Sequence, residues 1–295
     1  MYKFIKRCIL KAMSLGFFNW LSDVSYLKWK FKLMLGYPLD LENPKTFNEK
    51  LNWLKLNDRK PEYTKLVDKY AVREYIANKI GKEYLVPLIG VYETIDDVPW
   101  AELPNRFVLK CTSGSGGNII CKDKSTLDLK AEIKKFKKFF RQNYFYNSRE
   151  YVYKDITPKI IIEQFISENE DTPDDYKFMC FNGTPKLIQV HRSRFSDMHS
   201  LDFYDTNWNK TSISQGNLIS DIDWKKPECF DLLFDLSSKL SKDFFHVRVD
   251  WYIVDKKIYF GELTFQDGAG FDKFDSYEDD LLLGLWLKLP VDSQC

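Results

Sequence analysis

Apolar residues recur at helical spacing in the first part of the chain and gather into strand-like runs in the second part. Residues 1–60 have a mostly helical pattern, with breaks at the Gly and Pro residues of 36–38 and 43–44. The spacing also predicts further helices at 64–80, 127–146, 230–240 and 280–289. Because helices precede grouped strands and no internal repeat is visible, the pattern predicts an α+β fold.

The strand-like runs of the second part fall into pairs. The sequence predicts strands at 107–111, 118–121, 159–166, 175–181, 185–192, 246–254 and 258–265, and a short strand or loop at 85–91. Asn182-Gly183 is the strongest short hairpin signal there is, and it joins one pair. Polar and apolar residues alternate in the last two pairs, so each pair is expected to bury one face and present polar side chains on the other.

A lysine stands immediately before a glycine-rich loop. A strand ends at Lys110, and a second apolar strand begins at Asn118. In a P-loop the lysine follows the glycines and a helix begins there, so this order is different. It favours a hairpin tip that closes over a polyphosphate, with backbone N–H groups and Lys110 making the contacts. An ordinary turn with a chance lysine is the alternative. The loop residues are Ser113, Gly114, Ser115, Gly116 and Gly117.

Charged residues share one face of the last strand pair. A hairpin register centred on Lys256 sets Asp250 directly opposite Glu262 and Arg248 opposite Thr264, with facing Cβ atoms about 5 Å apart. Two carboxylates at that distance repel each other unless a cation lies between them, and Mg²⁺ favours carboxylates together with substrate phosphates. The pattern therefore predicts magnesium ligands, beside an arginine suited to a phosphate or a developing anion. An exposed hairpin with scattered charges is the alternative.

Two further candidates have equally simple alternatives. Lys177 shares a strand face with Asp175 and would be a second phosphate-directed cation or part of a surface ion pair. Glu163 ends a run of three isoleucines, where it would form a hinge between two lobes or merely end an edge strand.

Composition narrows the class of protein. The net charge of +1 argues against a general nucleic-acid binder. The six cysteines form no CxxC pair and no zinc spacing with the three histidines, which favours a reducing, cytoplasmic setting. No apolar run approaches the roughly 18–20 residues that span a bilayer. Residues 1–18 mix basic and apolar side chains, so this helix either lies at the inner face of a membrane as a peripheral contact or packs on the domain.

Taken in chain order, these motifs resemble the ATP-grasp superfamily and, more narrowly, the teichuronopeptide-biosynthesis (TupA-like) ATP-grasp family. The broader likeness rests on the Lys110 loop, on residues 163–166, on Arg248-x-Asp250 and on Glu262-x-Thr264. The narrower likeness rests on residues 43–51, 68–70 with Arg73, 175–178 and 261–265.

The resemblance implies an ATP-grasp fold in which ATP lies between two α+β lobes. A helical N-terminal region precedes the lobes in the chain. The expected division is a helical region at 1–62, a small lobe with the phosphate lid at 63–165 and a large lobe with the metal hairpin at 166–295. Lys69 and Lys110 resemble the phosphate-contacting lysines of the family, and residues 113–117 resemble its mobile lid.

The remaining site residues follow from the same likeness. The implied adenine hinge consists of Glu163, Gln164, Phe165 and Ile166, with the backbone of Gln164 and Ile166 at the base edge and with Asp175 also on the nucleotide.

Asp250 and Glu262 match the Mg²⁺ carboxylates, and Glu262 would bridge two ions. Thr264 stands where many members carry Asn, and a hydroxyl is a weaker ligand, which puts the second ion in doubt.

ATP-grasp enzymes typically phosphorylate a carboxylate, and an amine then attacks the acyl phosphate. The leading hypothesis is therefore a carboxylate–amine ligase that modifies a cell-surface polysaccharide or its precursor, with Arg248 and Lys177 as catalytic cations. Arg192 and Arg194 are candidates for binding an anionic sugar or amino-acid substrate, or are surface arginines. The alternatives are an ATP-grasp sugar kinase, a sugar-nucleotide glycosyltransferase and a nucleotide-binding module without turnover.

Overall fold

Two antiparallel sheets form the centre of the molecule in the computed structural model, which describes residues 2–167, 173–192, 199–216 and 219–290. The smaller sheet has the strand order β1–β4–β2–β3, and the larger has the order β7–β6–β5–β8–β9. The strands are β1 (Leu88–Tyr92), β2 (Phe107–Cys111), β3 (Asn118–Cys121), β4 (Ile160–Gln164), β5 (Asp175–Phe181), β6 (Thr184–Arg192), β7 (Ser200–Tyr204), β8 (His246–Val254) and β9 (Lys257–Thr264).

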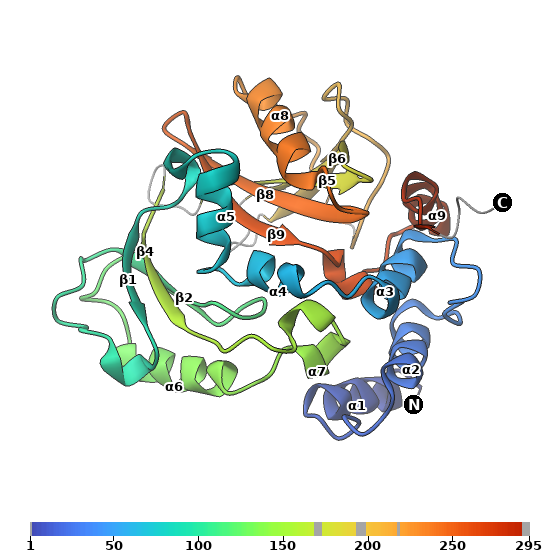
Figure 1. Ribbon diagram of the computed structural model, residues 1–295, viewed down its shortest axis with the longest axis horizontal. Coiled ribbons are helices and arrows are strands. Elements are labelled where there is room, and N and C mark those ends of the chain that lie inside the picture. Colours follow the sequence, from blue (N-terminus) through green and yellow to red (C-terminus); the bar gives the residue numbers. More distant parts are fainter. Residues whose placement is uncertain (1, 168–172, 193–198, 217–218, 291–295) are drawn as a thin grey trace.

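Helices cover both sheets and form a separate group at the N-terminal end (Figure 1). They are α1 (Tyr2–Ser14), α2 (Asp23–Leu35), α3 (Phe47–Asn57), α4 (Pro61–Val67), α5 (Val72–Lys79), α6 (Leu129–Phe140), α7 (Phe145–Ser148), α8 (Phe230–Ser241) and α9 (Tyr277–Trp286). Short 3₁₀ segments are η1 (Lys82–Tyr84), η2 (Ile95–Asp97), η3 (Tyr151–Tyr153) and η4 (Asp267–Gly270). The predicted α+β fold with a helical N-terminal region is confirmed.

Several element boundaries differ from the sequence prediction. The helix expected at 64–80 is two helices, because the chain turns at 68–71, where the Asp68 carboxylate accepts hydrogen bonds from two backbone N–H groups. The helix expected at 127–146 likewise ends at Phe140, and α7 follows. Strand β7 was not predicted.

The two faces of the larger sheet differ in chemistry. One face is apolar along its length and packs on α8, α4 and α5. The other is apolar only at one end, where Met179, Phe181 and Leu187 join the core beneath α3 and α9. Along the same face the register brings Lys177 opposite both Asp250 and Gln189. The alternation of side chains along a strand therefore places a charged floor directly beside a hydrophobic core.

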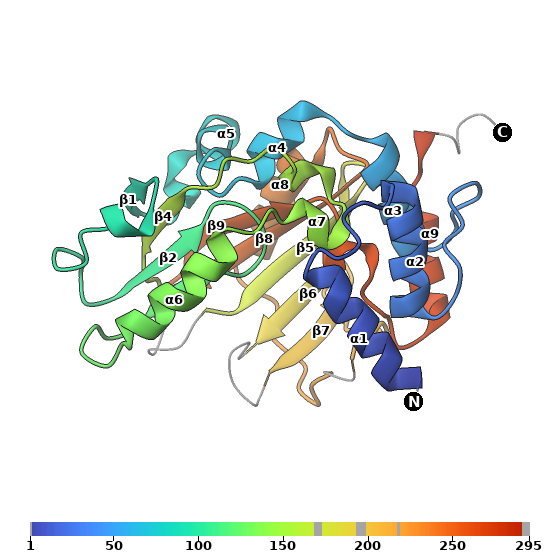
Figure 2. The same ribbon diagram turned by 90° about the horizontal axis from the view of Figure 1, so that it is seen from below.

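Helices α4 and α5 precede the small sheet in the chain but pack into the core of the large sheet. Residues of α4 and α5 pack against β5, β8 and β9, whereas the small sheet packs on α6 through its own cluster. Figure 2 shows α6 along the small sheet, and α1, α2 and α3 grouped at the opposite end. The division of the chain at residues 62 and 165 stays a prediction.

Candidate active site

Two cavities lie beside the sheets and are lined by most of the predicted site residues. The smaller has a volume of about 140 Å³ and is lined by Lys110, residues 163–166 and Asp175, together with apolar side chains of β2 and β3. The larger has a volume of about 540 Å³ and is lined by Ser115 of the glycine loop, Lys177, Arg248, Glu262 and Thr264. The sequence motifs therefore converge on two neighbouring spaces.

Lys110 and Glu163 form an ion pair at the smaller cavity. The Lys110 Nζ lies 2.7 Å from one carboxylate oxygen of Glu163, and Arg73 Nη1 lies 2.8 Å from the other. Glu163 is buried, because β4 is an inner strand of its sheet. The backbone N–H of Gln164 donates to the Pro87 carbonyl at 2.9 Å, so it is not free to donate to a base.

The glycine loop bends toward the larger cavity. Lys69 Nζ donates to the Gly114 carbonyl of the loop at 2.6 Å. Lys110 lies on the strand that leads into the same loop, so both lysines predicted to contact phosphates adjoin it. Gly117 has a φ of +63°, and a Cβ there would collide with the ring of Phe139. Only glycine tolerates both the left-handed backbone and this close approach.

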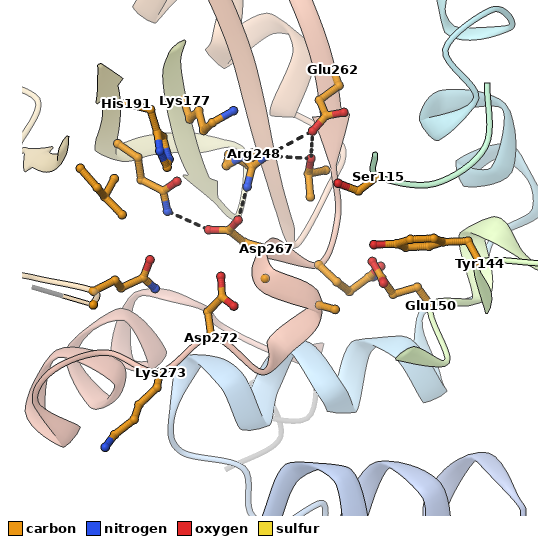
Figure 3. Close-up of a pocket in the computed structure, with 18 of the residues that line it drawn as sticks. Ser115, Tyr144, Glu150, Lys177, His191, Arg248, Glu262, Asp267, Asp272 and Lys273 are labelled. Atoms are coloured by element: carbon orange, nitrogen blue, oxygen red, sulfur yellow. Dashed lines mark hydrogen bonds and ion pairs between the residues drawn. The ribbon is translucent and has the colours of Figure 1, made fainter. Parts of the chain in front are cut away.

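Arg248 lies at the centre of a buried charge cluster in the larger cavity (Figure 3). Its Nε and Nη2 donate to the two Asp250 oxygens at 2.7 and 2.8 Å. Its Nη1 donates to Asp267, and its Nη2 also reaches Glu262 at 3.3 Å and Thr264 at 3.2 Å. Three carboxylates thus surround one guanidinium.

The register of this strand pair corrects one sequence prediction. Arg248 does lie opposite Thr264, as predicted. The turn, however, consists of Asp255 and Lys256, both with positive φ, and a bulge between Val249 and Trp251 restores the register. Asp250 is therefore not paired one-to-one with Glu262. Side-chain alternation did not reveal the bulge, but Gly261 lies within it, and glycine is common at such irregularities.

The cluster shifts the pKa values of its members. Burial alone would raise the pKa of Asp250, but the Arg248 guanidinium and the Lys177 ammonium hold it well below its usual range. Burial likewise opposes a lowered pKa at Asp267, where Arg248 again prevails. Both carboxyl groups are therefore ionised whenever the protein is folded near neutral pH.

Several residues that line the larger cavity were not predicted from the sequence. Glu150, Tyr144, Gln266, Asp267 and Asp272 come from segments with no recognisable motif. In Figure 3, Tyr144 and Glu150 extend toward the cavity from the same side as Ser115, below Glu262 in this view. Only a fold that brings residues 144–150 back to the larger sheet could reveal them.

The predicted anionic-substrate arginines are placed differently. Arg192 pairs with Asp174, donates to the Tyr176 hydroxyl at 3.2 Å and stacks 3.9 Å above the Trp224 ring. It lies outside the two cavities described above. Arg194 lies outside the described residues.

Comparisons with known proteins define the class. The model of the TupA-like ATP-grasp family matches residues 49–288. The chain therefore belongs to this family, as its sequence motifs suggested, and its enzyme class is that of ATP-dependent ligases. No curated protein matches it.

Several solved structures to which the chain is similar are ligases. D-alanine–D-alanine ligase from Bacillus anthracis is 17% identical over 78% of this chain and 69% of that chain, with a TM-score of 0.44. The Helicobacter pylori D-alanine–D-alanine ligase is 15% identical over 83% and 70%, also with a TM-score of 0.44. The ATP-grasp ligase PsnB in complex with its minimal precursor is 11% identical over 80% and 67%, with a TM-score of 0.39.

Proposed function

We propose that this protein is an ATP-dependent carboxylate–amine ligase that acts through an acyl phosphate. The observation that carries the proposal is that Lys110, on the strand that leads into the glycine loop, lines the smaller cavity, while Ser115 of that loop lines the larger one. In this proposal the base of ATP occupies the smaller cavity, next to Phe165 and Ile166, and Asp175 faces the nucleotide. The triphosphate extends past Lys110 and Lys69 toward the larger cavity.

The chemistry of the donor set fits Mg²⁺ beside the nucleotide. Among the described residues, the ion pairs of Asp250, Glu262 and Asp267 are with Arg248 and Lys177, so three carboxylates are paired with two cations. Among the described residues no three His, Cys, Asp or Glu side chains are arranged to hold a metal by themselves. Mg²⁺ ordinarily takes one or two carboxylates and completes its shell with phosphate oxygens and water. Asp250, Glu262 and Thr264 are the residues that would hold it.

In this proposal, Arg248 and Lys177 balance negative charge during phosphoryl transfer. Bound Mg²⁺ would offset charge on the transferred phosphoryl group. Lys177 is buried, Arg248 is mostly buried, and carboxylates hold both in place, so they are preorganised to stabilise a developing anion. The glycine loop, held by Lys69, covers the cavity and limits the entry of water, which would hydrolyse an acyl phosphate.

The acceptor that we propose is a carboxylate on a cell-surface polysaccharide or its precursor. Support for the polysaccharide comes from membership of the TupA-like family alone. Arg192 forms an ion pair with Asp174, so it could bind an anionic sugar only after that ion pair is broken.

We also propose a peripheral contact of α1, together with the residues 15–20 that follow it, with an anionic membrane surface at the inner face. Phe4, Phe17 and Trp20 are each at least two-thirds exposed, and the nearby Arg7 and Lys11 are exposed as well. Such a face favours the interface of a bilayer through buried apolar area and through attraction to acidic lipids. No helix among the described residues is long and apolar enough to cross a membrane. Sedimentation with vesicles of acidic or neutral lipid tests the contact, and Trp20→Ser should weaken binding to the acidic vesicles.

A hydroxylamine trap tests the ligase reaction. The protein is incubated with Mg-ATP and single uronic acids or amino acids, and formation of ADP, phosphate and hydroxamate is measured. The proposal expects hydroxamate with at least one acid. A stable phosphosugar with ADP would indicate a sugar kinase instead. Product formation from a sugar nucleotide without ATP would indicate a glycosyltransferase and overturn the proposal.

A further inference from the structure

One end of the larger cavity presents hydrogen-bond acceptors rather than cations. Glu150 is buried, with only 4% of its surface exposed, yet it lines the cavity. Ser148 Oγ donates to one of its carboxylate oxygens, Oε2. The other oxygen, Oε1, has no hydrogen-bond partner among the residues that the structure describes.

A second acceptor in the same cavity is also unpartnered. Gln266 is 6% exposed and lines the cavity, and its Oε1 is buried without a hydrogen-bond partner in the described part of the chain. A buried amide oxygen without a donor costs free energy, on the order of 1–3 kcal/mol. Such an atom in a cavity wall indicates that a donor is missing there, and a ligand would supply it.

Asp272 and Tyr144, neither of which is a cation, line the same cavity. Asp272 lies at the rim of the cavity, where desolvation and the Asp267 carboxylate raise its pKa to about 6. Burial, and then the charges of Glu150 and Glu262, raise the pKa of Tyr144, so its hydroxyl stays neutral. Lys273 points away from the cavity in Figure 3. Lys55 and Lys30 partly offset the charge of Glu150, but neither lines the cavity, so the cavity wall here presents acceptors that suit a cationic donor.

The N-terminal helices hold Glu150 in this position. Arg149 has a left-handed backbone, with a φ of 57°, and its guanidinium stacks 4.2 Å from the Tyr26 ring of α2. This turn sends Arg149 toward α2 and Glu150 toward the cavity. A non-glycine residue in that conformation is costly, about 1–3 kcal/mol, and persists only where the surroundings enforce it.

One buried lysine connects both acceptors to the same helix. Lys55 of α3 donates to the carbonyls of Ser148 at 3.0 Å and Ala269 at 2.5 Å. Ser148 carries the hydroxyl that holds Glu150, and the Ala269 N–H in turn donates to the Gln266 carbonyl at 2.9 Å. Glu150 and Gln266 are thus fixed relative to each other although 116 positions of sequence separate them.

We propose that Glu150 and Gln266 form the subsite that binds the ammonium group of the amine substrate, beyond Glu262 in the larger cavity. The proposal rests on the ligase function and adds the charge class of the second substrate. The N–H donors of a primary ammonium match the two unpartnered acceptors, Glu150 Oε1 and Gln266 Oε1. A neutral or anionic nucleophile would leave these acceptors unmatched.

The subsite also accounts for the protons of the reaction. The ammonium releases one proton to Glu150 Oε1, and the amine nitrogen then forms a bond to the acyl carbon. The bond from that carbon to the phosphate oxygen breaks, and its electron pair leaves on the phosphate. The amide nitrogen loses its second proton to the departing phosphate, and the proton on Glu150 returns to solvent.

Ligand-observed NMR with defined probes tests the subsite directly. The probes are individual amino acids and putrescine, each compared with its N-acetylated form, on the full chain. We expect wild-type protein to bind at least one free amine at least tenfold better than its acetylated form. Glu150→Gln and Gln266→Leu should each remove most of this preference, whereas Glu228→Gln, at a site whose side chain is 90% exposed, should keep it.

Folding of the variants and the ligase function itself are checked separately. Glu150→Gln should fold, because burial already lowers the pKa of Lys55 to about 7 and the lysine can release its proton. Hydroxamate formation is measured with wild-type protein, because hydroxylamine is a neutral nucleophile and tests the ligase function without the ammonium subsite. Equal binding of free and acetylated amines, no binding of any amine by wild type, or unchanged preference in both variants would overturn the subsite. Absence of hydroxamate with wild type would instead count against the ligase function.

Discussion

Two acidic residues of the charge cluster should respond differently to the loss of one negative charge. Asp250 is 1% exposed and accepts hydrogen bonds from Arg248 and Lys177, both of which are themselves mostly buried. The Glu262 side chain is 38% exposed, and its ion pair with Arg248 is 3.3 Å long. We therefore compare Asp250→Asn with Glu262→Gln, each of which keeps the shape of the side chain.

The structure sets the size of the two effects on stability. Removing one partner from a buried ion pair typically costs about 3–5 kcal/mol, because the remaining cations stay buried. With a typical unfolding entropy of about 2.1 cal/mol/K per residue, that loss lowers the Tm of a chain of this length by roughly 5–8 °C. A half-exposed pair contributes less than about 1 kcal/mol, so Glu262→Gln should change the Tm by under about 2 °C.

Activity should follow a different order from stability. Loss of either carboxylate should reduce acyl phosphate formation at least about 100-fold, since each removes a proposed ligand of Mg²⁺ and its charge. Tm is measured by differential scanning calorimetry, and activity by the hydroxamate trap at saturating Mg-ATP. The exposed-site variant Glu228→Gln is the control for both measurements.

Two results would contradict this reasoning. Full activity in Glu262→Gln would refute its role at the metal. A Tm unchanged in Asp250→Asn would show that Arg248 and Lys177 do not depend on this carboxylate, contrary to the buried geometry.

Three further outcomes are expected. Lys110→Met should weaken Mg-ADP binding at least about tenfold by titration calorimetry with little loss of stability, because Glu163 keeps its Arg73 partner; unchanged affinity would exclude a phosphate contact. Gly117→Ala should destabilise the loop by about 1–3 kcal/mol and increase ATP hydrolysis without amide formation, and normal coupling would contradict the fit of this loop. The lowered pKa values of Asp250 and Asp267 mean that the unfolded chain binds more protons than the folded chain, so the stability from these groups is complete above the ordinary carboxyl pKa of about 3.9 and is lost as pH falls below it. Thermal unfolding between about pH 6 and pH 3 measures this loss, which should be smaller in Asp250→Asn.

The sequence predicted those parts of the site that lie within one strand or one turn. Side-chain alternation was enough to place Lys177 with Asp175 on one face of β5, and Arg248 with Asp250 on one face of the neighbouring strand β8. The placement of Arg248 opposite Thr264 also followed from the hairpin. These features depend on local geometry, which the residue pattern determines.

Features that depend on distant segments could not be predicted. Glu150 reaches the cavity because Lys55 and Arg149 anchor its segment to α3 and α2, and no spacing in the sequence encodes that approach. The pairing of Arg192 with Asp174 is similar, because an arginine near the end of a strand gives no sign of its partner. The turn of the β8–β9 pair lies at Asp255 and Lys256, which alone would shift the pairing by one residue. The bulge between Val249 and Trp251 reverses that shift, so Arg248 still lies opposite Thr264.

The mixed face of the larger sheet has a consequence for how β8 finds its partners during folding. A slip of β8 by one residue would turn Arg248 and Asp250 toward α8 and turn Val249 and Trp251 toward the cavity. Two charges would then enter an apolar core without partners, and a large indole would face water. Wrong pairings of this strand are therefore strongly disfavoured, and the residues proposed to act on ATP also help the chain to select a single alignment of its central strands.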